Sequence, residues 1–427
     1  MSEVAAPHRT HRLRWLVIAI IAVAVLAAGA LGVAIVMVEN DQDAGQAALK
    51  ATTVDAGSLA ARVPFEAVAG HVVIDVGLGD GVETVPLILD SGAPVTFSDE
   101  LADLRAGEPV GRLATAAIDG SVIRVDVVPV EIVTVGDAEF RDVGAVGSFI
   151  GLDNPLSCIS PNGLIGANLM RAAVWQIDYD AGEVTIAAST DELDHIDGAI
   201  RIPFEPASEA SPSPIIEISA GDDTLRFLID TGSDGWLTIS AADAEAAGIG
   251  VGPDAPSYSV EAAGAAGTYL AEIAYTSTDL MFGERLLPNV PIATLDTLAD
   301  GQGNIGNAFL ENFVVTFDWD DSYLYLDPIV DEISPDVPAS AGITWDGEII
   351  RVGSLVAGSD AESAGVVLGA PVVAVDGVDV SAATRDDFCD VLRAQVAGQP
   401  FDLTVGGEAP GDHRIEPVTD FFVTLDG

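Results

Sequence analysis

Leu87-Ile88-Leu89-Asp90-Ser91-Gly92 places an apolar run directly before an Asp-Ser-Gly turn, and Phe227-Leu228-Ile229-Asp230-Thr231-Gly232 repeats this arrangement 140 residues later. Two further pairs of segments keep the same offset: Gly163–Gly166 with Gly303–Gly306, and Trp175–Asp180 with Val315–Asp320. Because one offset holds for three landmarks, the chain contains a duplicated structural unit. Short apolar runs between Gly and Asp turns predict that each copy is built from β-strands.

Each aspartate stands where a buried strand is expected to end in a turn, and the glycine that follows permits the backbone geometry of that turn. Two copies related by a pseudo-twofold axis can bring Asp90 and Asp230 face to face. When two carboxyl groups lie so close together, both cannot ionise readily, so one of them keeps its proton at moderately acid pH. The ionised group could act as general base on a shared water while the other donates to a carbonyl oxygen. The sequence therefore predicts a hydrolytic dyad, although either motif alone could be an ordinary turn.

The two Asp-Ser/Thr-Gly motifs and the later apolar-Gly motifs resemble those of the pepsin/retropepsin superfamily, and especially bacterial retropepsin-like aspartyl proteases. This resemblance implies a mainly β, bilobal fold with lobe 1 at residues 61–190 and lobe 2 at residues 199–328. It also implies that Asp90 and Asp230 form the catalytic dyad and that no cofactor is needed. The residues implied as supports of the two loops are Ser91, Gly92, Thr231, Gly232, Ser233, Gly166 and Gly306.

The chain departs from this family's pattern in several places. Ala93 stands where the second loop has Ser233, so the two loops are chemically unequal, and Asn304 replaces an aliphatic residue in the second apolar-Gly motif. The family also implies a β-hairpin from each copy over the cleft. The candidates are Ile118–Ser121 and Gly264–Gly267, which are turn signals between apolar strands. The first candidate lacks the tyrosine that pepsin-like flaps usually carry.

The 427-residue chain has a formal net charge of −50, and Lys50 is its only lysine. Such a surface repels nucleic acid and anionic lipid and suits a secreted or surface domain. The histidines and cysteines are not spaced as metal ligands, so no metal site is expected. Cys158 and Cys389 form either an interdomain disulfide in an oxidising compartment or two unrelated buried thiols. The sequence favours the thiols, because it cannot establish the geometry that a disulfide requires.

Residues 15–38 contain no charged side chain and are long enough to span a bilayer. Arginines precede them and acidic residues follow them. This asymmetry predicts that residues 1–14 stay in the cytoplasm and that everything after the anchor lies outside it. Residues 39–60 are small and polar and predict a flexible stalk. The alternative is a cleaved signal peptide with its cleavage site near Ala28–Ala30.

Residues 329–340 are rich in Pro and Asp and predict a linker. After it, residues 341–427 resemble a bacterial PDZ domain, with a small unrelated β domain as the alternative. The residues that carry this resemblance are Ala361, Ala364, Gly365, Gly369, Val375, Asp376 and Gly377. Ala370 and Pro371 depart from the family's pattern.

The PDZ resemblance implies that an extended peptide, usually a C-terminus, binds by adding a strand. Its carboxylate would meet backbone amides near Ala341, Gly342 and Ile343. The groove would lie between this strand and a helix that begins at Arg385. Two closing strands are predicted at residues 401–405 and 419–425.

These features together predict a monomeric, membrane-anchored, extracytoplasmic aspartic endopeptidase whose PDZ-like domain recruits or positions polypeptide substrates. Two other classes stay open. One is a non-catalytic surface scaffold that has a protease-like fold and binds peptides or proteins. The other is a self-processing sensor that cleaves its own stalk near residues 40–60. A statine-type transition-state mimic would inhibit a protease, whereas a scaffold would show no turnover.

Overall fold

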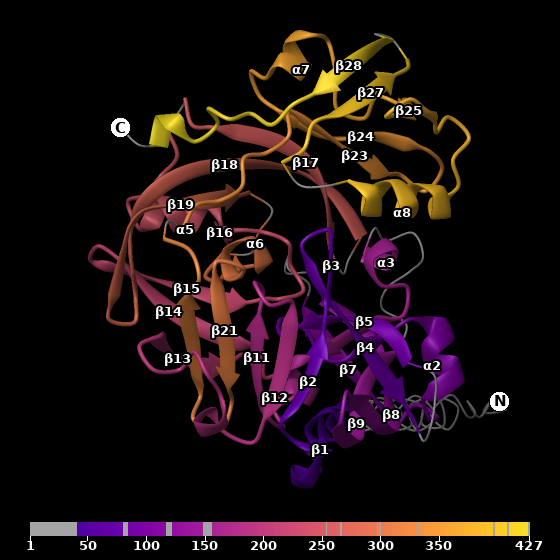
Figure 1. The fold of residues 1–427 in the computed structure, drawn as a ribbon, viewed down its shortest axis with the longest axis vertical. Helices are drawn as coiled ribbons and strands as arrows, with labels where there is room; N and C mark the ends of the chain where they lie inside the picture. The colour runs from indigo at the N-terminus through magenta and orange to yellow at the C-terminus, as the bar shows by residue number, and fades with distance from the viewer. Residues whose placement is uncertain are drawn as a thin grey trace, which may run out of the picture.

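β-strands make up most of the regular structure, which confirms the mainly β fold predicted from the sequence (Figure 1). The computed structural model describes residues 41–79, 84–116, 122–147, 156–252, 254–264, 267–296, 298, 300–331, 333–395, 398–407 and 410–425. The predicted cytoplasmic tail at residues 1–14 and membrane anchor at residues 15–38 lie outside these residues. Within them, no helix has both the length and the apolar character needed to cross a membrane.

Lobe 1 is built on a sheet with the strand order β1-β9-β6-β10-β5-β4-β8-β7, to which β3 is added beside β4. These strands are β1 (Thr53–Val54), β3 (Glu66–Val68), β4 (His71–Leu78), β5 (Thr84–Asp90), β6 (Thr96–Phe97), β7 (Gly111–Ala116), β8 (Val122–Val135), β9 (Ala138–Gly147) and β10 (Gly163–Gly166). The helices are α2 (Asp99–Arg105), α3 (Leu156–Ile159) and α4 (Ala167–Met170). Strand β5, which delivers Asp90, lies inside this sheet between β10 and β4.

A second sheet joins the lobes in the order β2-β12-β11-β21-β22-β13. These strands are β2 (Ala61–Pro64), β11 (Val174–Asp178), β12 (Glu183–Ala187), β13 (Ile200–Pro206), β21 (Phe313–Asp318) and β22 (Tyr323–Pro328). Strands β11 and β21 are antiparallel neighbours in which Gln176 pairs with Thr316. The Gln176 Nε2 also donates to Thr316 Oγ1 at 2.8 Å. Since these residues occupy the same place in the two copies, the pseudo-twofold axis passes between them.

Lobe 2 continues from this sheet through β14-β15-β20-β16-β19-β18-β17. These strands are β14 (Pro214–Ala220), β15 (Asp223–Ile229), β16 (Leu237–Ile239), β17 (Ser257–Gly264), β18 (Gly267–Phe282), β19 (Arg285–Leu295) and β20 (Gly303–Ile305), with helices α5 (Ala241–Ala246) and α6 (Asn307–Leu310). Ile305 pairs with Ile229 in parallel, just as Ile165 pairs with Leu89 in lobe 1. The duplication read from the sequence is therefore also a duplication of strand register.

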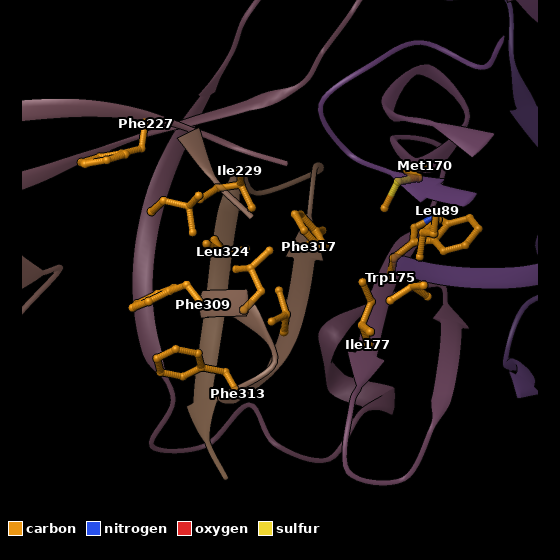
Figure 2. Packing of buried hydrophobic residues seen from close by; sticks show 14 of the residues in the cluster. Leu89, Met170, Trp175, Ile177, Phe227, Ile229, Phe309, Phe313, Phe317 and Leu324 are labelled. Carbon is orange, nitrogen blue, oxygen red and sulfur yellow. The ribbon is translucent and has the colours of Figure 1, made fainter. Parts of the chain in front are cut away.

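One apolar core runs through both lobes (Figure 2), and it includes Leu89 and Ile229, which directly precede the two aspartates. In lobe 1, Leu89 and Trp175 are fully buried, and the Trp175 ring stacks on Phe140 at 5.9 Å. In lobe 2, Phe309 stacks on Phe282 at 5.3 Å and is also fully buried. Because both aspartate-bearing strands are packed on this core, neither aspartate loop can shift without disturbing it.

The third part, here called the C-terminal unit (residues 341–425), combines strands with one regular helix. Its elements are β23 (Ala341–Trp345), β24 (Ile350–Val356), α7 (Asp360–Ser363), β25 (Val372–Val375), β26 (Val378–Asp379), α8 (Arg385–Ala394), β27 (Phe401–Val405), β28 (Gly411–Ile415) and the 3-10 turn η3 (Val423–Leu425). Helix α8 begins where the sequence predicts, because Thr384 and Asp387 form a capping box at its N-terminus. Strand β24 pairs with β17, so the C-terminal unit continues the sheet of lobe 2.

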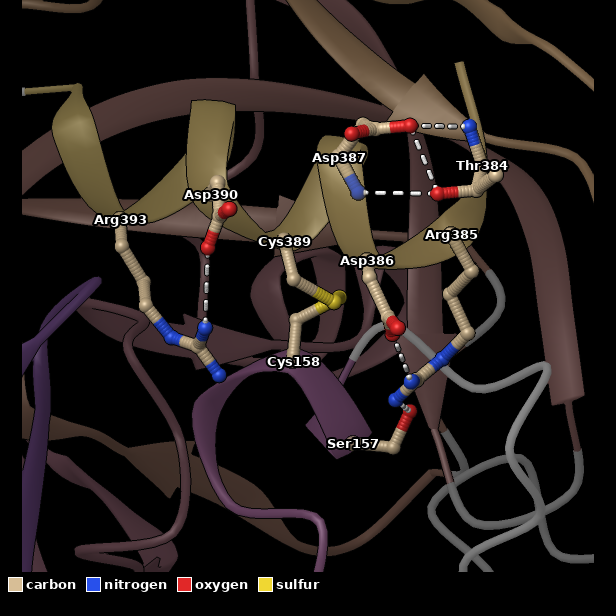
Figure 3. Close-up of polar contacts among 9 residues, drawn as sticks. All are labelled: Ser157, Cys158, Thr384, Arg385, Asp386, Asp387, Cys389, Asp390 and Arg393. Carbon is tan, nitrogen blue, oxygen red and sulfur yellow. Dashed lines mark hydrogen bonds and ion pairs between the residues drawn. A yellow bond between two sulfur atoms is a disulfide. The ribbon is translucent and has the colours of Figure 1, made fainter.

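A disulfide joins Cys158 of α3 to Cys389 of α8 (Figure 3). The interpretation of these residues as unrelated thiols is therefore wrong. The error has a physical cause: the Cα atoms lie 4.9 Å apart although 231 residues separate them in sequence, and only the packing of α8 over lobe 1 brings them together. Arg385 and Ser157 contact each other beside the disulfide and reinforce the same junction. The C-terminal unit is thus attached to both lobes, by β-pairing to lobe 2 and by a covalent bond to lobe 1.

Residues 41–54 do not form the flexible stalk expected from their composition. Residues 41–50 are helical, and Leu49 is fully buried in a cluster with Leu113 and Val127 of lobe 1. Strand β1 then pairs with β9. The small residues that suggest flexibility instead permit close packing, since a Cβ added to Gly45 would lie 2.6 Å from the Arg112 carbonyl oxygen. Self-cleavage in this segment would have to act on packed structure.

The last predicted strand, at residues 419–425, is also wrong. Strand β28 takes its place and pairs with β27, whereas residues 423–425 form the turn η3. The reason is an aromatic cluster. Phe421 and Phe422 lie 5.7 and 5.1 Å from the Tyr275 ring of β18. This packing holds the chain end against lobe 2.

Candidate active site

Asp90 and Asp230 are delivered by equivalent strands to the junction of the two lobes. Strand β5 ends at Asp90, which pairs with Gly166 of β10. Asp230 follows β15, and its amide donates to the Ile305 carbonyl at 2.9 Å. The predicted dyad residues are therefore brought together, although 140 residues separate them in sequence. Buried parallel pairing on one side of each strand fixes the height at which each aspartate leaves its sheet.

The hydroxyl groups of Ser91 and Thr231 lock the two aspartate loops to each other. Ser91 Oγ donates to the Ile229 carbonyl and Thr231 Oγ1 donates to the Leu89 carbonyl, both at 2.7 Å. In return, the amide of Ser91 donates to Thr231 Oγ1 at 2.9 Å, and the amide of Thr231 donates to Ser91 Oγ at 3.1 Å. Both side chains are fully buried. The hydrogen bonds cross from one lobe to the other, so they set the separation of the aspartates as well as their orientation.

The two carboxyl groups face each other across the loop glycines. Gly92 donates to Asp90 Oδ1 at 2.8 Å, and Gly232 donates to Asp230 Oδ1 at 3.1 Å. A Cβ at Gly92 would lie 2.4 Å from Asp230 Oδ1, and a Cβ at Gly232 would lie 2.3 Å from Asp90 Cγ. Each glycine is therefore required because the opposite carboxyl group occupies the space of a side chain. Protonated Asp90 can donate a hydrogen bond to Asp230.

The environment separates the acidities of the two aspartates. Burial raises the pKa of Asp90 well above its ordinary value, and the charge of Asp230 raises it further. Burial also raises the pKa of Asp230, but hydrogen bonds from Asn304 and Asp90 and the nearby His71 oppose that rise. The pKa of Asp90 is thus raised more strongly than that of Asp230, which favours Asp90 as the group that keeps a proton. This division is what general acid and general base catalysis require of a carboxyl pair.

Gly166 and Gly306 pack against the backbone of the aspartate loops. A Cβ at Gly166 would lie 2.2 Å from the Pro94 carbonyl carbon, and one at Gly306 would lie 2.5 Å from the Gly235 carbonyl oxygen. These are contacts with backbone atoms, which cannot move aside as a flexible side chain can. Ser233 has a different role, because its Oγ accepts a hydrogen bond from the Gly235 amide at 3.1 Å and shapes its own loop.

Two asparagines support the Asp230 loop in ways that the sequence did not reveal. Asn304 Nδ2 donates to Asp230 Oδ2 at 3.1 Å. Asn307 Nδ2 donates to the Thr231 carbonyl at 2.7 Å, and its Oδ1 accepts a hydrogen bond from the Tyr179 hydroxyl, also at 2.7 Å. Tyr179 belongs to lobe 1, so this chain of bonds ties the lobe 2 loop to the other half. The departure at Asn304 from the aliphatic pattern was the available signal.

The predicted flap hairpins differ in how far they are described. Ile118–Ser121 lies outside the described residues, although β7 and β8 pair up to Ala116 and Val122 on either side of it. In lobe 2, β17 and β18 form a hairpin that pairs as far as Gly264 and Gly267. The second candidate thus lies at the tip of a hairpin. Within the described parts of the chain, no three metal-ligating side chains are grouped to hold a metal ion.

One comparison with known proteins falls on the same region. Residues 216–309 match the sequence model of the family described as Aspartyl protease. No curated protein matches the chain. The crystal structure of an aspartic proteinase from Irpex lacteus matches with a TM-score of 0.39 and 14% identity, over 63% of this chain and 97% of that one. The family match spans Asp230, Asn304 and Gly306, so this chain is similar in sequence to aspartyl proteases across the Asp230 loop and strand β20.

Proposed function

We propose that this protein is an aspartic endopeptidase that hydrolyses peptide bonds with a water activated by Asp90 and Asp230. The observation that carries the proposal is the reciprocal set of hydrogen bonds between the Ser91 and Thr231 loops, which holds two buried carboxyl groups against each other. An arrangement needed only for folding would not bury two carboxyl groups together, because their mutual repulsion and desolvation are costly.

The two carboxyl groups have complementary tasks in this reaction. Asp230 takes a proton from the water as the water oxygen bonds to the peptide carbonyl carbon. Asp90 gives its proton to the carbonyl oxygen, so the tetrahedral intermediate is an uncharged diol. When the C–N bond breaks, the proton on Asp230 passes to the leaving nitrogen and one diol proton returns to Asp90. The reaction ends with an amine, a carboxylic acid and the original protonation of the dyad.

The test is cleavage of an unstructured protein by the purified full chain between about pH 3 and 7, the range in which a shared-proton dyad titrates. Salt should be added to screen the acidic surface. Wild-type cleavage that is lost in both Asp90→Asn and Asp230→Asn, and that a statine-type mimic blocks, would support the proposal. Residual cleavage in Asp230→Asn would overturn the dyad assignment. Absence of cleavage by folded wild-type protein would favour a binding role.

We also propose that the catalytic lobes lie outside the cytoplasm, anchored by residues 15–38. The apolar span with its basic flank supports this orientation. The bond between Cys158 and Cys389 adds support, because disulfides persist in oxidising compartments and are rare in the cytosol. The test is digestion of intact cells with an added protease. Loss of the lobes before lysis is the expected result, and protection until lysis would contradict it.

A peptide-docking role is proposed for the C-terminal unit, as its resemblance to PDZ domains implies. Strand β23 ends its sheet and pairs with β24 alone among the described strands. Gly342 and Ile343 on this strand are partly exposed, and the partly buried Val391 and Leu392 of α8 pack on the same apolar cluster. An unpaired strand edge beside apolar side chains suits an added peptide strand.

Because β23, β24, β17 and β18 are consecutive in one sheet, a peptide added at β23 would extend the sheet that contains the lobe 2 hairpin. The test is binding of fluorescent apolar peptides to the full chain, each with a free C-terminal carboxylate or with an amide. Preference for the free carboxylate, lost on Ile343→Lys, would support docking at β23. Equal binding of both forms would contradict it.

A further inference from the structure

Leu164 and Asn304 occupy the same place in the two halves of the active site. Leu164 pairs with Ile88 in lobe 1, two residues before Asp90, and Asn304 pairs with Leu228 in lobe 2, two residues before Asp230. The surroundings of the two side chains nevertheless differ. Leu164 packs in an apolar cluster, whereas Asn304 reaches the dyad.

The Asn304 side chain is buried, with 6% of its surface exposed, and its Nδ2 lies 3.1 Å from Asp230 Oδ2. Its Oδ1 is also buried and has no hydrogen-bond partner among the described residues. A half-satisfied buried amide is unfavourable for stability. Lobe 1 shows that a leucine builds the same strand pairing, so the amide is not needed to form the loop. The hydrogen bond to Asp230 is the interaction that offsets this loss of stability.

We propose that Asn304 is a positioning residue that decides which aspartate is the base: it holds Asp230 as the carboxylate and leaves Asp90 as the acid. This inference rests on the proposed proteolytic function. A neutral N–H donor favours the ionised form of the carboxyl group that it contacts. Asp230 receives such a bond on Oδ2 from Asn304, in addition to the Gly232 bond on Oδ1. Asp90 is contacted by amides of its own loop, those of Gly92 and Ala93.

The titratable groups that act on Asp230 are Asp90 on β5 and His71 on β4. The His71 side chain is buried, and its Nδ1 lies 2.9 Å from the Ala69 carbonyl oxygen. Both groups remain in place when residue 304 is changed. A difference between the wild type and a residue 304 variant therefore reports the amide and not a changed set of charges.

The first experiment compares pH profiles of kcat/KM for the wild type, Asn304→Leu and the exchange Leu164→Asn/Asn304→Leu. Loss of the amide should move the acidic limb up by about one pH unit, which lowers activity on that limb about tenfold. The exchange moves the side-chain amide donor from Asp230 to Asp90, and it should return the acidic limb to its wild-type position. Asn312→Leu is the control, because the Asn312 side-chain amide donates to the α6 carbonyls of Ala308 and Phe309 and not to an aspartate of the dyad. This variant should change stability without moving the limb.

The second experiment identifies the carboxylate directly with a small aryl epoxide. The ionised carboxylate attacks an epoxide carbon, an ester C–O bond forms, the ring C–O bond breaks, and the alkoxide takes the proton of the other aspartate. Mass spectrometry should place the label that a statine-type mimic blocks on Asp230 in the wild type and on Asp90 in the exchange variant. A label on Asp90 in the wild type, or equal labelling of both, would overturn the inference.

These outcomes separate the inference from the function on which it rests. Failure of folded wild-type protein to cleave any substrate would overturn the proposed function. The position of the epoxide label would then still show whether Asp230 is the ionised aspartate. Wild-type cleavage that depends on Asp90, together with an unchanged acidic limb in Asn304→Leu, would leave the protease intact and reject the role of Asn304. If the exchange variant fails to fold, the pH profile of Asn304→Leu still tests the role of Asn304. This variant is expected to fold because leucine occupies the equivalent position, Leu164, in lobe 1.

Discussion

Ser91 and Thr231 exchange hydrogen bonds across the lobe junction: the amide of each donates to the hydroxyl oxygen of the other, at 2.9 and 3.1 Å. The two residues belong to different copies of the duplicated unit, so each half of the site is completed by the other half. A lone lobe would leave one amide and one carbonyl of its own aspartate loop without these partners. The duplication is therefore built into the chemistry of the loops as well as into the fold.

Thr231→Val should destabilise the protein and reduce activity together. The substitution keeps the shape but removes the hydroxyl, so the Ser91 amide and the Leu89 carbonyl lose a buried partner. The expected cost is about 2–3 kcal/mol of unfolding free energy, measured by urea denaturation. Thr224→Val on the exposed part of β15 is the control and should change stability little. Equal effects of the two substitutions would contradict a role for the hydroxyl.

Asp90→Asn should alter the pH dependence of stability. The pKa of Asp90 is raised in the folded protein, so the folded state binds more protons than the unfolded state above the unfolded pKa of about 3.9. Wild-type stability should therefore fall as the pH rises through the folded pKa, and this loss should be smaller in the variant, where Asp230 alone of the two still contributes. Denaturation of both proteins at pH 3 and pH 7 would show it. The expectation would be refuted if the variant's gain in unfolding free energy over the wild type were no larger at pH 7 than at pH 3. Asp180→Asn at the surface serves as the control.

Reduction of the disulfide should destabilise the chain by about 4 kcal/mol, because the bond closes a very long loop in the unfolded state. Thermal unfolding with and without reductant measures the effect. The double variant Cys158→Ala/Cys389→Ala should match the reduced wild type and should not respond to reductant. A wild-type melting temperature that is indifferent to reductant would show that the bond does not contribute.

Gly306→Ala should lower kcat/KM more than tenfold, since the new Cβ would meet the backbone of Gly235 at 2.5–2.8 Å and displace the Asp230 loop. Gly250→Ala is a matched control in the same lobe, because a Cβ there meets nothing within 4 Å. The measurement is steady-state cleavage, with circular dichroism to check folding. Normal activity of Gly306→Ala would mean that the loop can shift without loss of alignment.

A structural feature could be predicted from the sequence when neighbouring residues or a repeated motif determine it, and could not when it depends on packing between distant segments. Asp90 and Asp230 could be paired because their motifs repeat at a constant offset, and the hairpin at Gly264–Gly267 could be placed because turn signals are local. The Cys158–Cys389 bond could be named from the sequence only as the less favoured alternative, since it depends on how α8 packs over lobe 1. The same holds for the burial of Leu49, which lies in a polar-looking segment.

Side-chain networks were also beyond the sequence. The departure at Asn304 was visible, but its bond to Asp230 Oδ2 required the loop geometry. The link from Tyr179 through Asn307 to the Thr231 carbonyl joins residues of both lobes and has no counterpart in sequence spacing. The repeated motifs were enough to locate the two aspartate loops. The side chains that make the two halves of the site unequal could be identified only from the packed structure.

The crosslink between Cys158 and Cys389 also bears on how the protein is made. Cys389 follows both lobes in the sequence, so both lobes and the C-terminal unit as far as α8 must be synthesised before the bond can close. A product truncated ahead of α8 would carry both aspartates but lack the tie between lobe 1 and the C-terminal unit. The oxidised form is therefore a chemical mark of a chain that extends through Cys389, and a shift in gel mobility on reduction would detect it in cell extracts.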